Sequence, residues 1–182
     1  MKYSAFIILF LLSTGSFAQV KAPETDFILK AGTVYWQHVY DVPGKSSTEI
    51  LQLVEEKFPE GINRDHFVKN DKQASFQVHN DKPNIRKMGG KEAKTHTIAL
   101  LYMKYQATID IEDGKYTATL RNIFLDNKDA TERKSGDISK FACNTSNLTF
   151  KTDPGILKGL IYLDMHLLEE FDIAAKPADP KK

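Results

Sequence analysis

The stretch IALLYMKYQATIDIEDGKYTATLRNIFL, residues 98–125, decides the fold of this chain. Apolar and polar side chains alternate on both sides of Asp113-Gly114. A period of two indicates β-strands, because successive side chains of a strand point to opposite faces. Asp-Gly favours a two-residue type I′ turn, whose two residues both need positive φ. The stretch therefore predicts a long antiparallel hairpin.

The hairpin can be given a register from its turn. On one face the apolar pairs are then Ile111 with Tyr116, Ile109 with Ala118, Ala107 with Leu120 and Met103 with Phe124. The opposite face is polar near the turn and turns apolar toward residues 98–102. One face is thus expected to pack on a core, while the other faces water over most of its length.

Three more elements are predicted ahead of this hairpin. Residues 33–42 alternate in the manner of a strand. Ser46 and Glu49 form a capping-box pattern, which predicts a helix reaching about residue 58. Residues 64–79 hold two short apolar patches around a polar turn, which is typical of a smaller hairpin.

A second helix is predicted after the long hairpin. Asp153 is a suitable cap, Pro154 fits the first helical turn, and apolar residues cover more than half of the helix circumference through residue 171. The polar segment 126–153 is longer than a usual structureless loop, so we expect a short strand near residues 148–151. The order β-α-β-β-β-β-α predicts an α+β fold.

The first eighteen residues predict export. Lys2 precedes the apolar run 5–12, and small residues lead to a cut between Ala18 and Gln19. The run is shorter than the roughly 20 residues of a membrane span, and no later segment reaches that length without a charge. Gln19 stands where a lipid-anchored bacterial protein would need a cysteine. We therefore expect a soluble periplasmic or secreted product, with no transmembrane segment in the mature chain.

Composition places the rest of the 182-residue chain in a single domain. We expect a polar leader at 19–32, the domain at 33–174 and a disordered tail at 175–182. Without Lys2 the basic residues of the chain equal its 24 acidic residues, so nothing favours a nucleic-acid partner. Cys143 is the sole cysteine and excludes an intramolecular disulfide.

Three stretches carry a resemblance to a known family. They are VYWQHVY at 34–40, PGKSS at 43–47 and the hairpin tip IEDGKY at 111–116. Over roughly 34–126 the chain resembles a family of exported bacterial proteins described only as a domain of unknown function with a TBP-like fold. The resemblance implies a curved antiparallel sheet with helices packed on one face. It implies no activity, and a shared fold does not transfer DNA binding.

The sequence carries no recognised pattern for catalysis or metal binding. The five histidines are scattered, and neither an H-E-x-x-H nor a G-x-S-x-G motif occurs. Asp164 and His166 are two positions apart on a helix and do not face each other. Cys143 has no base near it in sequence and is expected to be a small buried or loop thiol. We therefore predict no catalytic residue, metal or cofactor.

Aromatic residues provide the one candidate site. Trp36, Tyr40, Tyr102, Tyr105 and Tyr116 are expected either to line a ligand pocket between sheet and C-terminal helix or to pack in the core. The first hypothesis for function is a non-catalytic exported domain that binds a small molecule or an envelope partner. One alternative is a structural or interaction module of the cell envelope, using the 126–153 loop or a strand edge. Another is an unrecognised hydrolase.

Overall fold

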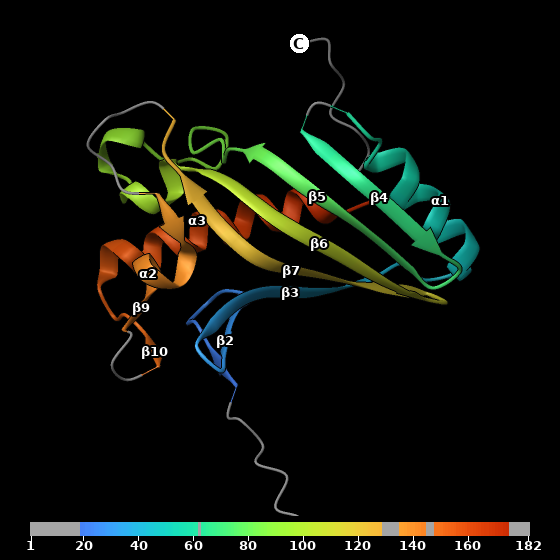
Figure 1. The fold of residues 1–182 in the computed structure, drawn as a ribbon, viewed down its shortest axis with the longest axis horizontal. Helices are drawn as coiled ribbons and strands as arrows, with labels where there is room; N and C mark the ends of the chain where they lie inside the picture. Colours follow the sequence, from blue (N-terminus) through green and yellow to red (C-terminus); the bar gives the residue numbers. More distant parts are fainter. Residues whose placement is uncertain (1–18, 62, 129–134, 145–147, 175–182) are drawn as a thin grey trace, which may run out of the picture.

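The computed structural model describes residues 19–61, 63–128, 135–144 and 148–174. Its main feature is an antiparallel sheet that curves around a long C-terminal helix (Figure 1). Seven strands lie side by side, and the short β8 pairs with the end of β7. Across the sheet the order is β1 (Val20–Lys21), β2 (Phe27–Lys30), β3 (Thr33–Asp41), β7 (Lys115–Asp126), β6 (Tyr102–Glu112), β5 (Gln73–Asp81) and β4 (Arg64–Asn70), with β8 at Gly136–Asp137.

The central hairpin β6–β7 turns at Asp113-Gly114, as predicted. Glu112 faces Lys115 and Ile111 faces Tyr116, so the register next to the turn is confirmed. The predicted turn type is wrong, because a type I′ turn needs positive φ at both residues, and Gly114 has φ of 77° while Asp113 is not among the residues with positive φ. Only the glycine adopts the left-handed conformation, which is less strained without a Cβ.

Farther from the turn the predicted register is wrong. Met103 pairs with Leu125 and not with Phe124, because β7 carries one extra residue in a β-bulge. Asn122 lies in this bulge with φ of 54°. The bulge changes which positions face inward, so Ile123 and Leu125 are buried while Phe124 is 38% exposed on the outer face.

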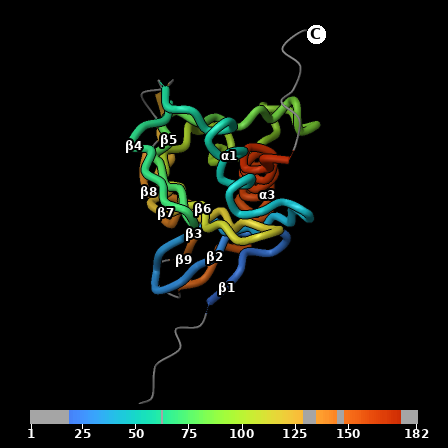
Figure 2. The backbone as a smooth tube through the Cα atoms, turned by 90° about the vertical axis from the view of Figure 1, so that its right-hand side faces the viewer, coloured from blue at the N-terminus to red at the C-terminus, as the bar shows by residue number. Residues whose placement is uncertain are grey.

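Two helices lie on the same side of the sheet (Figure 2). The helix α1 (Ser47–Lys57) begins with the predicted capping box, in which the Ser46 hydroxyl accepts from Glu49 N–H and the Glu49 carboxylate accepts from Ser46 N–H. The helix α3 (Pro154–Phe171) begins after Asp153, whose carboxylate accepts from Ile156 N–H at 2.9 Å. Both helix starts agree with the sequence.

The segment 19–32 is part of the sheet and is not a polar leader ahead of the domain. Strand β2 pairs along β3, and β1 pairs with β2. Phe27 and Leu29 are 0% and 3% exposed. Their alternation with Ile28 and Lys30 is a strand pattern too short to stand out against its polar surroundings. The expected leader 1–18 and tail 175–182 lie outside the described residues.

The segment 126–153 holds more structure than expected. The predicted short strand is confirmed as β10 (Thr149–Phe150), which pairs with β9 (Cys143–Asn144). The helix α2 (Ile138–Ala142) was not predicted. Before the long hairpin, residues expected to begin a strand form the 3₁₀-helix η2 (Thr97–Leu100), which follows η1 (Glu92–Lys94). None of the described helices is long and apolar enough to cross a membrane.

Candidate ligand-binding site

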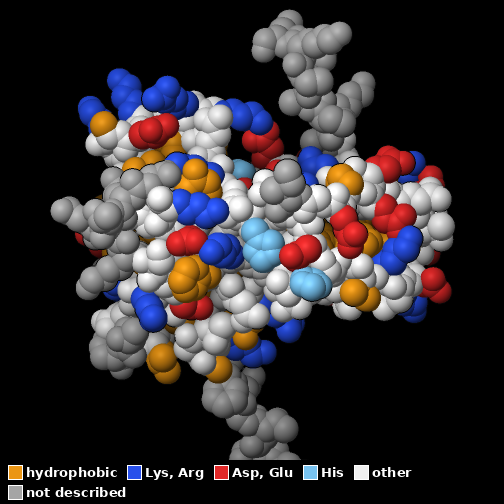
Figure 3. All heavy atoms as spheres, turned by 45° about the horizontal axis from the view of Figure 1, so that its top comes forward, with side chains coloured by type: hydrophobic (Ala, Val, Ile, Leu, Met, Phe, Trp, Pro, Cys, Tyr) orange, Lys and Arg blue, Asp and Glu red, His pale blue; other side chains and the backbone are white. Residues whose placement is uncertain are grey.

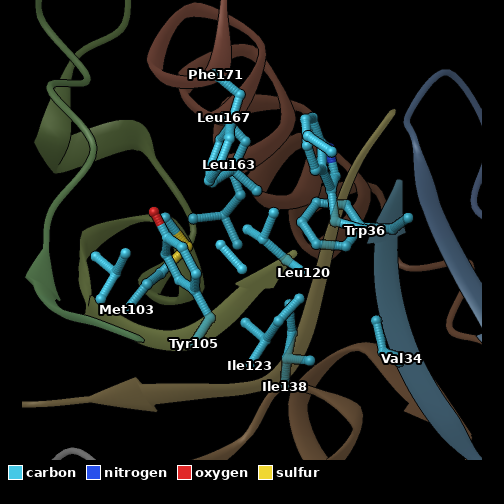
Figure 4. Close-up of a cluster of buried hydrophobic side chains, with 14 of the residues drawn as sticks. Val34, Trp36, Met103, Tyr105, Leu120, Ile123, Ile138, Leu163, Leu167 and Phe171 are labelled. Carbon is cyan, nitrogen blue, oxygen red and sulfur yellow. The ribbon is translucent and has the colours of Figure 1, made fainter. Parts of the chain in front are cut away.

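Side chains fill the space between the sheet and α3, where the sequence left a ligand pocket and core packing as alternatives. Trp36, Tyr105 and Tyr116 are 0%, 4% and 1% exposed, which leaves no room for water against their rings. Phe171 of α3 lies 5.8 Å from the Trp36 ring and 6.2 Å from the Tyr105 ring, measured between centroids. Figure 4 shows these rings packed with Leu163 and Leu167. These aromatic residues therefore belong to the core.

The remaining two residues of the predicted pocket lie apart from that cluster's centre. Tyr40 is half-buried and stacks on Tyr116 with 4.8 Å between ring centroids. Tyr102 lies at the far end of β6, where the Lys82 ammonium is 4.6 Å from its ring centroid and the Lys128 ammonium 5.4 Å. The structure therefore brings four of the five aromatic residues together and separates Tyr102 from them.

The hydroxyls of Tyr40 and Tyr116 donate hydrogen bonds to carbonyl groups in the last turn of α3. Tyr116 donates to the Phe171 carbonyl at 2.7 Å, and Tyr40 donates to the Leu168 carbonyl at 3.0 Å. The last carbonyls of a helix have no partner within the helix, so these bonds satisfy groups that would otherwise be unpaired. Burial raises the pKa of both tyrosines, which keeps the hydroxyls protonated as donors. These polar atoms are occupied by the fold and are not presented to a ligand.

Asp164 of α3 is a buried carboxylate that joins the helix to the first strands. Its Oδ1 accepts from Trp36 Nε1 and from Asp26 N–H, both at 2.8 Å. Burial raises the pKa of Asp164 against the opposing effect of these two hydrogen bonds. Asp26 in turn is 2.6 Å from His38 Nδ1 and 2.6 Å from Lys21 Nζ. Its burial opposes ionisation, yet the hydrogen bonds from Lys21 and His38 prevail and lower its pKa.

His166 belongs to a second internal network. Its Nε2 lies 2.6 Å from Asp81 Oδ1, and Tyr105 donates to the other oxygen of Asp81 at 2.8 Å. Burial of the imidazole opposes its protonation, but the hydrogen bond and charge of Asp81 prevail and raise the pKa of His166. As the sequence predicted, Asp164 and His166 do not face each other. Both networks link α3 to the sheet, and the described residues contain no group of three or more His, Cys, Asp or Glu that could hold a metal ion.

The uncovered face of the sheet carries a hollow that the sequence did not predict. Strand β2 turns sharply back into β3 through Ala31-Gly32, and this end of the sheet bends away from the helices (Figure 1). A hollow of about 300 Å³ lies here among β2, β3 and β7. Its lining residues are Gln19, Ile28, Lys30, Ala31, Tyr35, Gln37, Thr119 and Arg121. We call it the β2–β3–β7 hollow.

Two cations and one aromatic ring define the chemistry of the β2–β3–β7 hollow. The Arg121 guanidinium lies 5.9 Å from the centroid of the Tyr35 ring. Gln37 Nε2 donates to the Thr119 hydroxyl at 3.0 Å, which fixes the amide beside them. Lys30 supplies the second positive charge, and none of the described residues that line the hollow is acidic. Neither Lys30 nor Arg121 forms an ion pair with any of the residues that the structure describes.

Cations at other hollows are already neutralised. Lys21 pairs with Asp26 at 2.6 Å beside the shallow hollow of residues 21–26. Lys104 pairs with Asp126 at 2.6 Å beside a hollow of about 210 Å³ on β5 and β6. Lys69 pairs with Glu55 between β4 and α1. The β2–β3–β7 hollow differs from these three because its two charges have no counterion among residues 19–61, 63–128, 135–144 and 148–174.

The charge on the face shown in Figure 3 is mixed. Acidic and basic side chains are interspersed there, with histidines near the middle. This face does not carry the single-sign stripe of a nucleic-acid binding surface.

Comparisons with known proteins identify the fold but no activity. No protein-family model and no curated protein sequence matches the chain. A TBP-like protein from Parabacteroides distasonis has a similar structure, with TM-score 0.53 and 15% identity, over 80% of this chain and 94% of that protein. A DUF4468 family protein from Bacteroides ovatus has TM-score 0.54 and 14% identity, over 93% and 95%. The predicted TBP-like α+β fold with a curved antiparallel sheet is confirmed.

Proposed function

We propose that the protein is an exported, non-catalytic domain that binds a small anionic molecule in the β2–β3–β7 hollow. The observation that carries the proposal is the presence of Lys30 and Arg121 in one hollow with no acidic partner in the part of the chain that the structure describes. Uncompensated cations in a concave site attract anions, because their mutual repulsion is relieved when a negative charge enters.

The lining narrows the class of ligand. A guanidinium binds carboxylate or phosphate oxygens in a two-pronged geometry. Tyr35 offers a ring face, and Ile28 adds apolar surface beside it. A volume of about 300 Å³ is at the small end of the range for ligand sites. An organic acid or a phosphate ester of modest size fits these features.

Export is supported by the sequence of the leader. A charged residue, an apolar run and a small-residue cut site after Ala18 are the parts of a secretory signal. Fractionation of the producing cells tests this part of the proposal. We expect the protein in the periplasm or medium with Gln19 as its first residue, and full-length chain confined to the cytoplasm would refute export.

A binding role through strand addition has less support. The edge strand β4 exposes Val68, but it also carries Asp65 and Lys69 and a bulge at His66 with φ of 55°. Charges and bulges on an edge strand oppose pairing with another chain. The structure thus favours the small-molecule hypothesis over the interaction-module alternative at this edge.

Binding can be measured by isothermal titration calorimetry with citrate, benzoate and inorganic phosphate, and with glucose as a neutral control. We expect at least one of the acids to bind and glucose not to bind. Arg121→Gln should weaken binding about ten- to hundredfold, because a hydrogen bond to a charged group contributes about 1.5–3 kcal/mol. Lys72→Gln removes the same charge at the β4–β5 turn and should leave binding unchanged.

Two results would overturn the binding proposal. One is equal affinity for citrate in the Arg121→Gln and unmodified proteins. The other is the absence of any binding by the three acids together with no small acid found by mass spectrometry after the exported protein is purified and denatured. That search also identifies the natural ligand when the proposal holds.

A further inference from the structure

We infer that removal of the leader completes the β2–β3–β7 hollow, because the cut before Gln19 places a new ammonium group at its rim. This inference rests on the proposed export and anion binding. It concerns the regulation of that same site: the chain gains its full affinity for an anion only after processing.

The position of Gln19 follows from the strand register. Val20 of β1 pairs with Leu29 of β2, so the next position outward puts Gln19 beside Lys30. Directly opposite residues of an antiparallel pair have Cα atoms about 4.5–5.5 Å apart, and their side chains share a face. Gln19 and Lys30 accordingly line the same hollow.

Processing changes the charge at this point. In the unprocessed chain the main-chain nitrogen of Gln19 belongs to an uncharged peptide bond. Hydrolysis by a signal peptidase adds one water across the Ala18–Gln19 bond, leaving a carboxylate on Ala18 and an amine on Gln19. The amine takes up a proton at neutral pH, since an α-amino group has a pKa of about 7.7–8.0. The processed hollow therefore contains three cations where the unprocessed one has two.

The new charge also makes binding depend on pH. The charged or titratable groups among the described lining residues are Lys30 on β2, Tyr35 on β3 and Arg121 on β7, and these lining residues include neither histidine nor carboxylate. An α-amino group ordinarily has a pKa of about 7.7–8.0. Affinity for an anion should thus fall as pH rises through about 8 in the processed protein.

The distance of the N-terminal amine from Lys30 depends on where the chain begins. All described helices and strands lie within residues 20–171, so the fold starts directly after the cut. A chain with extra residues before Gln19 keeps the same elements but carries its amine farther from Lys30. The number of residues before Gln19 can therefore be varied to test the role of the amine.

The experiment compares two exported proteins with citrate and inorganic phosphate as probes. One begins at Gln19, and the other keeps a Gly-Ser-Gly-Ser extension before it. We expect citrate to bind about tenfold more tightly to the first protein at pH 7, with the difference shrinking toward pH 9.5. Equal melting temperatures of the two proteins show that the extension leaves the fold intact.

Three other outcomes would overturn this inference. Equal citrate affinity in both proteins, lost in both on Arg121→Gln, overturns this inference and leaves the proposed function standing. No binding of either probe to either protein refutes the inference along with the anion site. An intact mass 17 Da low also overturns it, because the Gln19 amine has then attacked its own side-chain amide, expelled ammonia and formed an uncharged lactam.

Discussion

Gly159 lies within α3 against Ile98 of η2, and its replacement by alanine sets two effects against each other. Alanine favours a helix over glycine by about 1 kcal/mol. A Cβ at position 159 would lie 2.6 Å from Ile98 Cγ1 and 2.9 Å from its Cδ1, far inside ordinary contact. Ile98 is 1% exposed, so its side chain must shift within the core to make room for the Cβ. Overpacking of this kind costs about 1–3 kcal/mol, so we expect Gly159→Ala to lower the free energy of unfolding by about 1 kcal/mol.

Urea unfolding at pH 7 measures this change as a lower midpoint at constant slope. The double variant with Ile98→Ala provides the decisive comparison, because alanine at 98 lacks the two clashing carbons. Ile98→Ala alone should cost about 2–5 kcal/mol, and it should cost less by roughly the overpacking energy when Gly159 is already alanine. Lys158→Ala, at an exposed neighbouring position, is the control for helix propensity. A Gly159→Ala protein more stable than the original, or strict additivity with Ile98→Ala, would refute the reasoning.

Three further predictions concern the buried polar groups. Asp81 raises the pKa of His166, so the stability contributed by their ion pair should be complete below about pH 6.5 and be lost as pH rises through the folded-state pKa. The difference in unfolding free energy between the original protein and His166→Gln, measured with urea, should shrink over that range, and a constant difference would contradict the prediction. Burial raises the pKa of Cys143 from 9.0 to about 11, so its alkylation by iodoacetamide at pH 8 should be about a hundredfold slower than that of a free peptide thiol. Equal alkylation rates would show that the Cys143 thiol is accessible to solvent and would contradict the prediction. Asp164→Ala leaves Trp36 Nε1 and Asp26 N–H without their acceptor and should lower the free energy of unfolding by about 1–3 kcal/mol for each of these donors, measured by thermal or urea unfolding. A variant as stable as the original would mean that the buried carboxylate contributes nothing to stability.

The bulge in β7 shows how the sequence register went wrong. Inward-facing residues are spaced by two up to Leu120, but the next buried residue is Ile123, three positions later. That spacing of three is the visible sign of an extra residue. Asn122 lies at the bulge, and asparagine tolerates positive φ better than most residues, so the bulge causes little backbone strain. Alternation alone could not place it, because both faces are partly apolar at this end of the hairpin.

The choice between an aromatic pocket and an aromatic core shows a different limit of sequence reasoning. The sequence correctly places Trp36 and Tyr116 on inward faces, but whether such rings line a cavity or a core depends on what reaches them from α3. Phe171 and Leu163 are long enough to close the space, and both are 0% exposed. Side-chain depth across a curved sheet is a property of the assembled fold and is not encoded in any local pattern.

The sequence by itself determined the order of the principal strands and helices, the caps at Ser46 and Asp153 and the turn at Asp113-Gly114, because each depends on residues that are close along the chain. Tertiary structure alone decided that Lys30 and Arg121 share a hollow, since 91 positions separate them and only the pairing of β3 with β2 and β7 brings them together. Local periodicity defines elements, whereas a binding site requires side chains from strands whose neighbours are chosen by the packing of the whole sheet.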